Sequence, residues 1–194
     1  MDVAIETSTI VASFIRALTD AKLVFFSQKF IEPPFIPNTI EEVLELAMVV
    51  KTVASTCHAA ALKPFYLKKE VVKTFVICTD EEENTSIDVN GEHLMFQALF
   101  KKYHDEVYPA RLVFVSFLHH QHAKGPMVVP LKAAGYNVSQ FKLDHRRPDL
   151  NKLNNMIGQL ALDGNIDFNQ RVSQLQQEIA KDGLRRAFQK LKSN

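Results

Sequence analysis

Residues 71–79, with the sequence VVKTFVICT, decide the fold class that this chain predicts. The stretch is almost continuously apolar and rich in β-branched residues, which is typical of a strand covered on both faces inside a parallel sheet. Residues 111–118, RLVFVSFL, have the same character. Between them, residues 91–108 carry apolar side chains at helical spacing, so the pattern predicts two parallel strands joined by a crossover helix.

Strands and helices are expected to alternate outward from this core in both directions. Residues 28–37 hold three prolines and suit an edge hairpin or an extended excursion, because proline cannot donate to a central ladder. Asn38, followed three residues later by Glu41, predicts the cap of a helix. The further elements that we expect are strands at 22–27 and 136–143 and helices at 2–19, 38–51, 127–134 and 148–162, with another helix starting near Ser55 or Thr56.

Together these elements predict an α/β fold with a doubly wound, mostly parallel sheet and helices on both faces. We expect this domain to span residues 1–165. Residues 166–194 carry apolar side chains at helical spacing, which Gly183 interrupts and which resumes after it in a shifted phase. We interpret them as a C-terminal amphipathic helical extension. Packing on its own domain, binding of a partner helix and self-association are all compatible with the apolar stripe of this extension.

The charges of the chain are unevenly placed, although its 194 residues sum to a formal net charge of only +1. Residues 1–90 carry 8 basic and 13 acidic side chains, a net charge of −5, and residues 91–194 carry 15 and 9, a net charge of +6. An anionic partner such as RNA should therefore prefer the second half. The candidates for phosphate contacts are Lys142, Arg146, Arg147, Arg185 and Arg186, with ordinary surface solvation as the alternative explanation.

Two features of the sequence bear on its compartment. Cys57 and Cys78 stand in apolar settings without metal-ligand spacing, so we expect neither a disulfide framework nor a zinc site and favour a reducing compartment. No apolar run approaches the roughly 20 residues of a membrane span, and Asp2 and Glu6 follow Met1 where a signal peptide would be basic. We expect a cytoplasmic protein.

The acidic segment DEEEN at 80–84 directly follows the decisive strand. Open α/β sheets bind ligands outside the carboxyl ends of their strands, and carboxylate oxygens at such a rim suit Mg²⁺. A solvated acidic loop is the alternative. No glycine-rich phosphate loop occurs in the sequence to favour a ligand site here.

Other residue types that carry chemistry form less specific patterns. His119, His120 and His122 follow the second apolar strand and could bind a transition metal or act as acid or base, with a polar surface loop as the alternative. Cys57 stands next to His58, but adjacent helical residues point about 100° apart and do not face each other. We therefore interpret Cys57 as a small buried residue.

Four pieces of sequence carry a resemblance to a known family. They are KLVFFSQKF at 22–30, NTIEEVLELA at 38–47, Ser55 and Thr56 before a short helix, and FVICTDEEEN at 75–84. In this order and spacing they resemble a von Willebrand factor A domain, closest to the intracellular kind at the end of Ro autoantigen (TROVE) proteins. The resemblance covers residues 2–162.

That resemblance implies a metal-ion-dependent adhesion site, in which Thr56 falls at the family's threonine position and Asp80 at its aspartate position. It also implies a rim for a protein partner, bordered by Ser55, Glu81 and Glu83. The family's Asp-x-Ser-x-Ser motif is absent from this sequence. We therefore expect weak Mg²⁺ binding or none, because one aspartate and one threonine leave few fixed ligands to offset the dehydration of Mg²⁺.

The resemblance further implies that the first strand of the family, at the centre of its sheet, is missing between the strands at 22–27 and 71–79. Two interior edges with unpaired backbone groups would result. Residues upstream of this sequence could supply the strand, the two flanking strands could pair directly, or another chain could be recruited.

Three hypotheses for function follow. The first is a non-enzymatic module that binds a protein partner at the rim with Thr56 and Asp80. The alternative is a Ro-like ribonucleoprotein component that binds RNA through the basic second half. A metal-assisted hydrolase that uses Asp80 with His119, His120 and His122 ranks last, because the sequence contains no recognisable pair of nucleophile and base.

Overall fold

The structure is a computed structural model that describes residues 3–19, 21–50, 55–118 and 124–143, and a few single positions of the last segment. The described residues fold as two compact units. One contains residues 3–19, 21–23 and 33–50, and the other contains residues 24–32, 55–118 and 124–143. The expected helix at 148–162 lies outside the described residues except for Gly158, and the expected boundary between residues 165 and 166 stays a prediction.

Helices α1 (Val3–Thr19) and α2 (Ile40–Val49) pack against each other in the first unit, with Phe14 and Val43 buried at their contact. The N-cap of α2 is Thr39, whose hydroxyl accepts a hydrogen bond from the backbone N–H of Glu42 while the Glu42 carboxylate accepts one from Thr39. The expected cap at Asn38 with Glu41 is therefore wrong by one residue. Thr39 has the extended backbone that the cap position requires.

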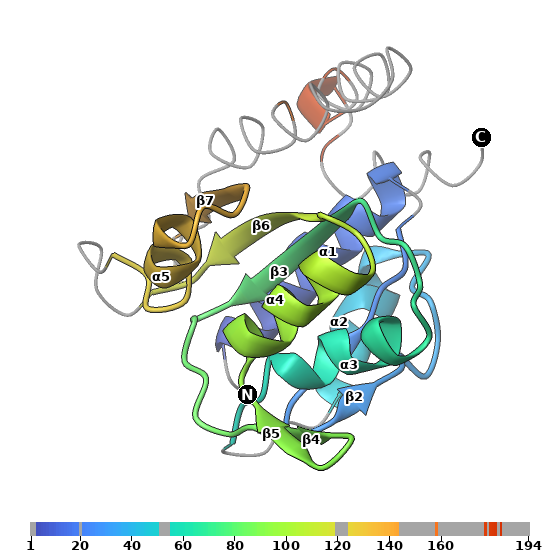
Figure 1. The fold of residues 1–194 in the computed structure, drawn as a ribbon. Helices are drawn as coiled ribbons and strands as arrows, with labels where there is room; N and C mark the ends of the chain where they lie inside the picture. The colour runs from blue at the N-terminus through green and yellow to red at the C-terminus, as the bar shows by residue number, and fades with distance from the viewer. Residues whose placement is uncertain are drawn as a thin grey trace. The chain divides into compact units, whose positions relative to one another are not determined.

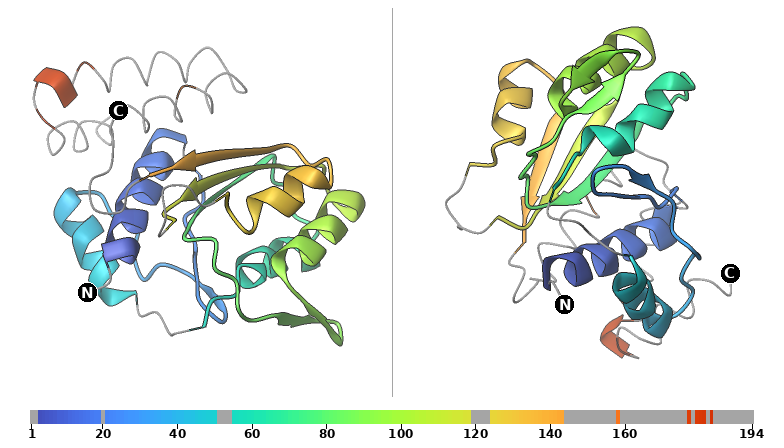
Figure 2. Two further views of the ribbon diagram at one scale, coloured as in Figure 1. Left: turned by 90° about the vertical axis from the view of Figure 1, so that its left-hand side faces the viewer. Right: turned by 90° about the horizontal axis from the view of Figure 1, so that it is seen from below.

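A three-stranded parallel sheet forms the centre of the second unit. Its strands β3 (Thr74–Thr79), β6 (Arg111–Ser116) and β7 (Val138–Lys142) stand in the order β3-β6-β7 and run side by side (Figure 1 and Figure 2). This pairing confirms the expected parallel strands and the α/β fold class. Each strand is shorter than its apolar stretch in the sequence.

Helices α3 (Ala59–Leu67), α4 (Phe96–Glu106) and α5 (Val128–Ala133) share one hydrophobic core with one face of this sheet. Leu112 and Phe114 of β6 are fully buried in it, together with Phe100 and Tyr103 of α4. Val113 belongs to the opposite face by strand alternation and is also fully buried. Both faces of the central strand are thus covered, as its sequence predicts.

A small antiparallel hairpin pairs β1 (Phe25–Phe26) with β2 (Phe30–Ile31). The hairpin expected at 28–37 is thus displaced toward the N-terminus, and its three prolines follow β2 in irregular chain. The strand expected at 22–27 is reduced to two half-buried residues of this hairpin. Among the described residues β1 pairs with no other strand, so the rearranged sheet in which 22–27 pairs directly with 71–79 is not formed.

A second hairpin, β4 (Ile87–Val89) with β5 (Glu92–Leu94), was not expected. The predicted helix at 91–108 is wrong at its start, because Asn90 and Gly91 have φ values of 55° and 86° and turn the chain into β5. An Asn-Gly pair is the usual signal of such a turn. Within the described residues, no helix has the length and apolar character needed to cross a membrane.

Candidate functional site

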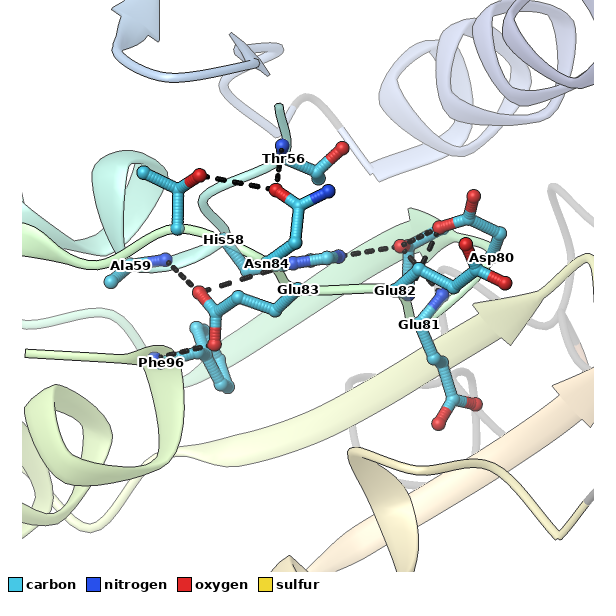
Figure 3. Close-up of polar contacts among 11 residues, drawn as sticks. Thr56, His58, Ala59, Asp80, Glu81, Glu82, Glu83, Asn84 and Phe96 are labelled. Carbon is cyan, nitrogen blue, oxygen red and sulfur yellow. Dashed lines mark hydrogen bonds and ion pairs between the residues drawn. The ribbon is translucent and has the colours of Figure 1, made fainter. Parts of the chain in front are cut away.

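The acidic segment 80–84 lies at the carboxyl end of β3, close to the first residues of α3 and α4 (Figure 3). The side chains of Glu81 and Glu83 leave this loop in different directions (Figure 3). Glu81 is only 1% exposed and the Glu83 side chain 7%, whereas Glu82 is exposed. The interpretation as a solvated acidic loop is therefore wrong for two of its carboxylates.

Glu83 caps two helices with one carboxylate. Its Oε1 accepts a hydrogen bond of 3.1 Å from the backbone N–H of Ala59, and its Oε2 accepts one of 2.8 Å from that of Phe96. Ala59 and Phe96 are the first residues of α3 and α4, and neither N-cap residue, His58 or Met95, makes a side-chain cap bond. A negative charge at a helix N-terminus is favourable because it meets unpaired N–H groups and the positive end of the helix dipole.

The electrostatics of Glu83 reflect this enclosure. Burial raises the pKa of the Glu83 carboxyl above its ordinary value, and the backbone N–H groups of Phe96, Ala59 and His58 act in the lowering direction. The buried carboxylate thus loses hydrogen bonds to water and gains hydrogen bonds from backbone N–H groups at the starts of the two helices.

Glu81, which follows β3 closely, links β6 and β7 to the start of α5. Its carboxylate accepts hydrogen bonds from the hydroxyl of Ser116 at the end of β6 and from Nε2 of Gln140 in β7. It also accepts bonds from the backbone N–H of Met127, at 3.1 Å, and of Val128, at 3.2 Å. Glu81 has a positive φ of 64°, a conformation that non-glycine residues rarely adopt. We call this set of contacts the Glu81 clamp.

His58 and Thr79 form a buried pair beside these carboxylates. Nε2 of His58 lies 2.5 Å from Oγ1 of Thr79, which also accepts a hydrogen bond from the backbone N–H of Glu81. Nδ1 of His58 lies 4.0 Å from the Glu83 carboxylate and has no hydrogen-bond partner in the described part of the chain. Burial lowers the pKa of His58 to about 4, and the charge of Asp80 opposes this effect. His58 is therefore a neutral imidazole near pH 7.

The residues Thr79, His58 and Glu83 have the types of a nucleophile, a base and an orienting acid. Their geometry does not fit that role, because 4.0 Å between Nδ1 and the carboxylate is beyond hydrogen-bond range. The Thr79 residue is only 6% exposed, so a substrate carbonyl would not reach its hydroxyl. The arrangement stabilises the end of β3 instead.

Thr56 is held against the acidic loop by two reciprocal hydrogen bonds. Its backbone N–H donates to Oδ1 of Asn84 at 2.8 Å (Figure 3). Its carbonyl accepts from the backbone N–H of Asn84 at 3.1 Å. The carbonyl of the preceding Ser55 accepts a bond of 3.4 Å from the Ser27 hydroxyl. The structure thus brings Ser55 and Thr56 to the same end of the sheet as Asp80.

Asp80 is half-buried, and its Oδ1 accepts a hydrogen bond of 3.1 Å from the backbone N–H of Glu82. In the described ranges, no group of three or more His, Cys, Asp or Glu side chains is placed to hold a metal ion. The partial metal site at Thr56 and Asp80 stays a prediction.

Several candidate residues fall outside the described part of the chain. They are His119, His120, His122, Arg146, Arg147, Arg185 and Arg186. Lys142 ends β7 and is half-buried. The RNA-contacting surface and the histidine site therefore also stay predictions.

Sequence reasoning missed the residues that organise this site. Ser116, Gln140 and Gly125 lie 35 or more residues from Glu81 along the chain, and no local pattern points to their contact. The sequence suggested only the neighbouring Cys57 as a partner for His58, and that pair was rejected, whereas the hydrogen-bond partner of His58 is Thr79, 21 residues away. Cys57 is fully buried, as expected.

No protein-family model, curated protein or solved structure matches this chain.

Proposed function

We propose that this chain is a non-enzymatic module that binds a protein partner at the carboxyl end of its parallel sheet. The observation that carries the proposal is the internal fixation of the loop after β3. Glu81, Glu83 and Asn84 direct their side chains to donors of the same unit, while Asp80 is half-buried and Glu82 is exposed. A loop that is ordered before binding loses little conformational entropy on binding.

We name Ser55, Thr56, Asp80 and Glu82 the β3 rim. Two carboxylates and two hydroxyls make this surface rich in hydrogen-bond acceptors. A protein partner that offers arginine, lysine or backbone N–H groups fits its chemistry. Glu81 and Glu83, which the family resemblance assigns to the rim itself, support the loop from the interior in this proposal.

The state of the buried groups supports binding over catalysis. His58 is neutral and 1% exposed, and its partner hydroxyl on Thr79 already accepts a backbone hydrogen bond. A general base must reach the proton that it removes in a bound substrate. Because both residues are buried, their hydrogen bonds stabilise the loop after β3 and are not available to a substrate.

The proposal is tested by affinity capture with the immobilised full chain. We expect a partner that the wild type retains and that Asp80→Ala loses. Asp88→Ala is the matched control, because Asp88 is an exposed carboxylate on β4 and lies outside the β3 rim. A partner retained equally by Asp80→Ala and by a Ser55→Ala, Thr56→Val double variant would place the binding surface elsewhere and contradict the proposal.

The role of metal is separated from the role of the rim by thermal unfolding. An ion that binds the native state must raise the free energy of unfolding. We propose that the β3 rim binds its partner without a bridging ion, so millimolar Mg²⁺ should change this free energy by less than about 0.5 kcal/mol. A larger rise that disappears in Asp80→Ala would show a working metal site and overturn the metal-independent form of the proposal.

A further inference from the structure

One edge of β3 has no partner strand in the described part of the chain. β6 pairs with the other edge, and the backbone N–H groups of Arg111 and Phe117 donate to the carbonyls of Lys73 and Thr79. Successive residues of a strand direct their backbone groups to opposite edges. The residues at 73, 75, 77 and 79 therefore face β6, and those at 74, 76 and 78 face outward.

The outward edge presents three N–H groups and three carbonyls from Thr74, Val76 and Cys78. Natural edge strands are usually blunted by a charged side chain, a proline, a bulge or a very short length. The six residues of β3, TFVICT, contain no charge, no proline and no glycine, and their pairing with β6 is regular along all six. Such an edge is a template for another strand.

The charges at the two ends of this edge indicate which strand fits it. Exposed Lys73 precedes β3, whereas Asp80 and exposed Glu82 follow it. A second copy of the chain in antiparallel orientation brings the basic end of one β3 next to the acidic end of the other, at both ends of the pair. A parallel copy would place like charges together, which is unfavourable.

We propose that two copies of this chain associate through their β3 edges in antiparallel orientation. Val76 of one copy lies opposite Val76 of the second, and Thr74 lies opposite Cys78, so that the outward N–H and carbonyl groups of both copies are satisfied. The two three-stranded sheets become one continuous sheet across a twofold axis. The association uses backbone hydrogen bonds and uncharged side chains and needs no ligand.

Sedimentation equilibrium of the full chain tests this proposal. We expect the wild type to reach twice the monomer mass of 22.0 kDa with rising concentration. Val76→Lys should weaken the association by about tenfold or more, because two lysines would meet at the twofold axis. Val129→Lys is the matched control and should leave the association unchanged, since Val129 is exposed on α5.

A second variant keeps the test valid if Val76→Lys disturbs folding. The N–H of Val76 points outward, so Val76→Pro removes one donor of the free edge and no hydrogen bond to β6. Circular dichroism verifies that it is folded, and its association should be weaker than that of the wild type. A wild type that stays monomeric up to its highest soluble concentration, or a dimer that neither variant weakens, overturns the proposal.

Oxidative cross-linking tests the register. In a Cys78→Ser background, Val76→Cys should form a disulfide-linked dimer on treatment with copper-phenanthroline, because the two introduced thiols face each other across the axis. Thr74→Cys in the same background should not, because its nearest counterpart lies four residues along the antiparallel strand. Cross-linking of Thr74→Cys without that of Val76→Cys contradicts the proposed pairing.

Discussion

The imidazole of His58 and the hydroxyl of Thr79 share a hydrogen bond of 2.5 Å, and both residues are buried. The bond joins the residue before α3 to the last residue of β3. The Thr79 hydroxyl also accepts a hydrogen bond from the backbone N–H of Glu81. The side chain of Glu81 in turn binds the first residue of α5. The Thr79 hydroxyl thus links the residue before α3 to the loop that carries the Glu81 clamp.

We predict that Thr79→Val lowers the free energy of unfolding by about 1–3 kcal/mol, because it leaves Nε2 of His58 and the N–H of Glu81 buried without a partner. Urea denaturation measures this loss. Thr74→Val on the same strand is the control, and its effect should stay within about 0.5 kcal/mol because Thr74 is only half-buried. Equal effects of both substitutions would refute the importance of the shared hydroxyl.

The stability should depend on pH through His58. Its pKa is about 4 in the folded chain and 6.5 in the unfolded chain, so the unfolded state binds more protons between these values. The stabilisation is complete above pH 6.5 and is lost as the pH falls toward 4, by about 3 kcal/mol in total. The raised pKa of Glu83 has the opposite effect on the free energy of unfolding. Folding favours the protonated form of that carboxyl, so this contribution grows as the pH falls.

Urea midpoints measured at several pH values between 6.5 and 4 check this dependence. His58→Gln removes the titrating group, so its free energy of unfolding should change less with pH than that of the wild type, whatever its absolute stability. An unchanged slope in His58→Gln would assign the acid sensitivity to other groups.

Glu83 should contribute more to stability than its surface neighbour. We predict that Glu83→Ala lowers the free energy of unfolding by about 1–4 kcal/mol, because the N-caps of α3 and α4 are both lost. Glu83→Gln keeps one acceptor oxygen and should cost less than Glu83→Ala. Glu82→Ala, at an exposed position of the same loop, is the control and should stay within about 0.5 kcal/mol.

The Glu81 clamp predicts a difference between two glycines. A Cβ on Gly125 would lie 2.6 Å and 2.8 Å from the two Glu81 carboxylate oxygens and would also collide with Gln140. Gly135 has the same positive φ of 85°, but nothing lies within 4 Å of its Cβ position. Gly125→Ala should therefore destabilise the chain by about 1–3 kcal/mol more than Gly135→Ala.

Thermal and urea unfolding of the two alanine variants measure that difference. Because both positions carry the same backbone cost, the difference reports on the space around the clamp alone. Equal stability of the two variants would show that the clamp yields to the added methyl group.

Local chemistry predicted the regular elements of this chain well. The apolar runs of β3 and β6 and the periodicity of α1 and α4 depend on the residues of one segment, so they can be read without the rest of the fold. The start of α4 was misplaced although its signal was local, because the Asn90-Gly91 turn was included in the helical pattern.

The sequence by itself determined a parallel α/β sheet and an acidic segment at the carboxyl end of its first strand. Only the tertiary structure decided what each acidic residue does: Glu81 holds α5, Glu83 caps two helices, and Asp80 and Glu82 are left for the surface. The physical reason is that a carboxylate is stable in the interior only where several donors converge on it. Those donors come from segments distant in the chain, and only folding brings them together.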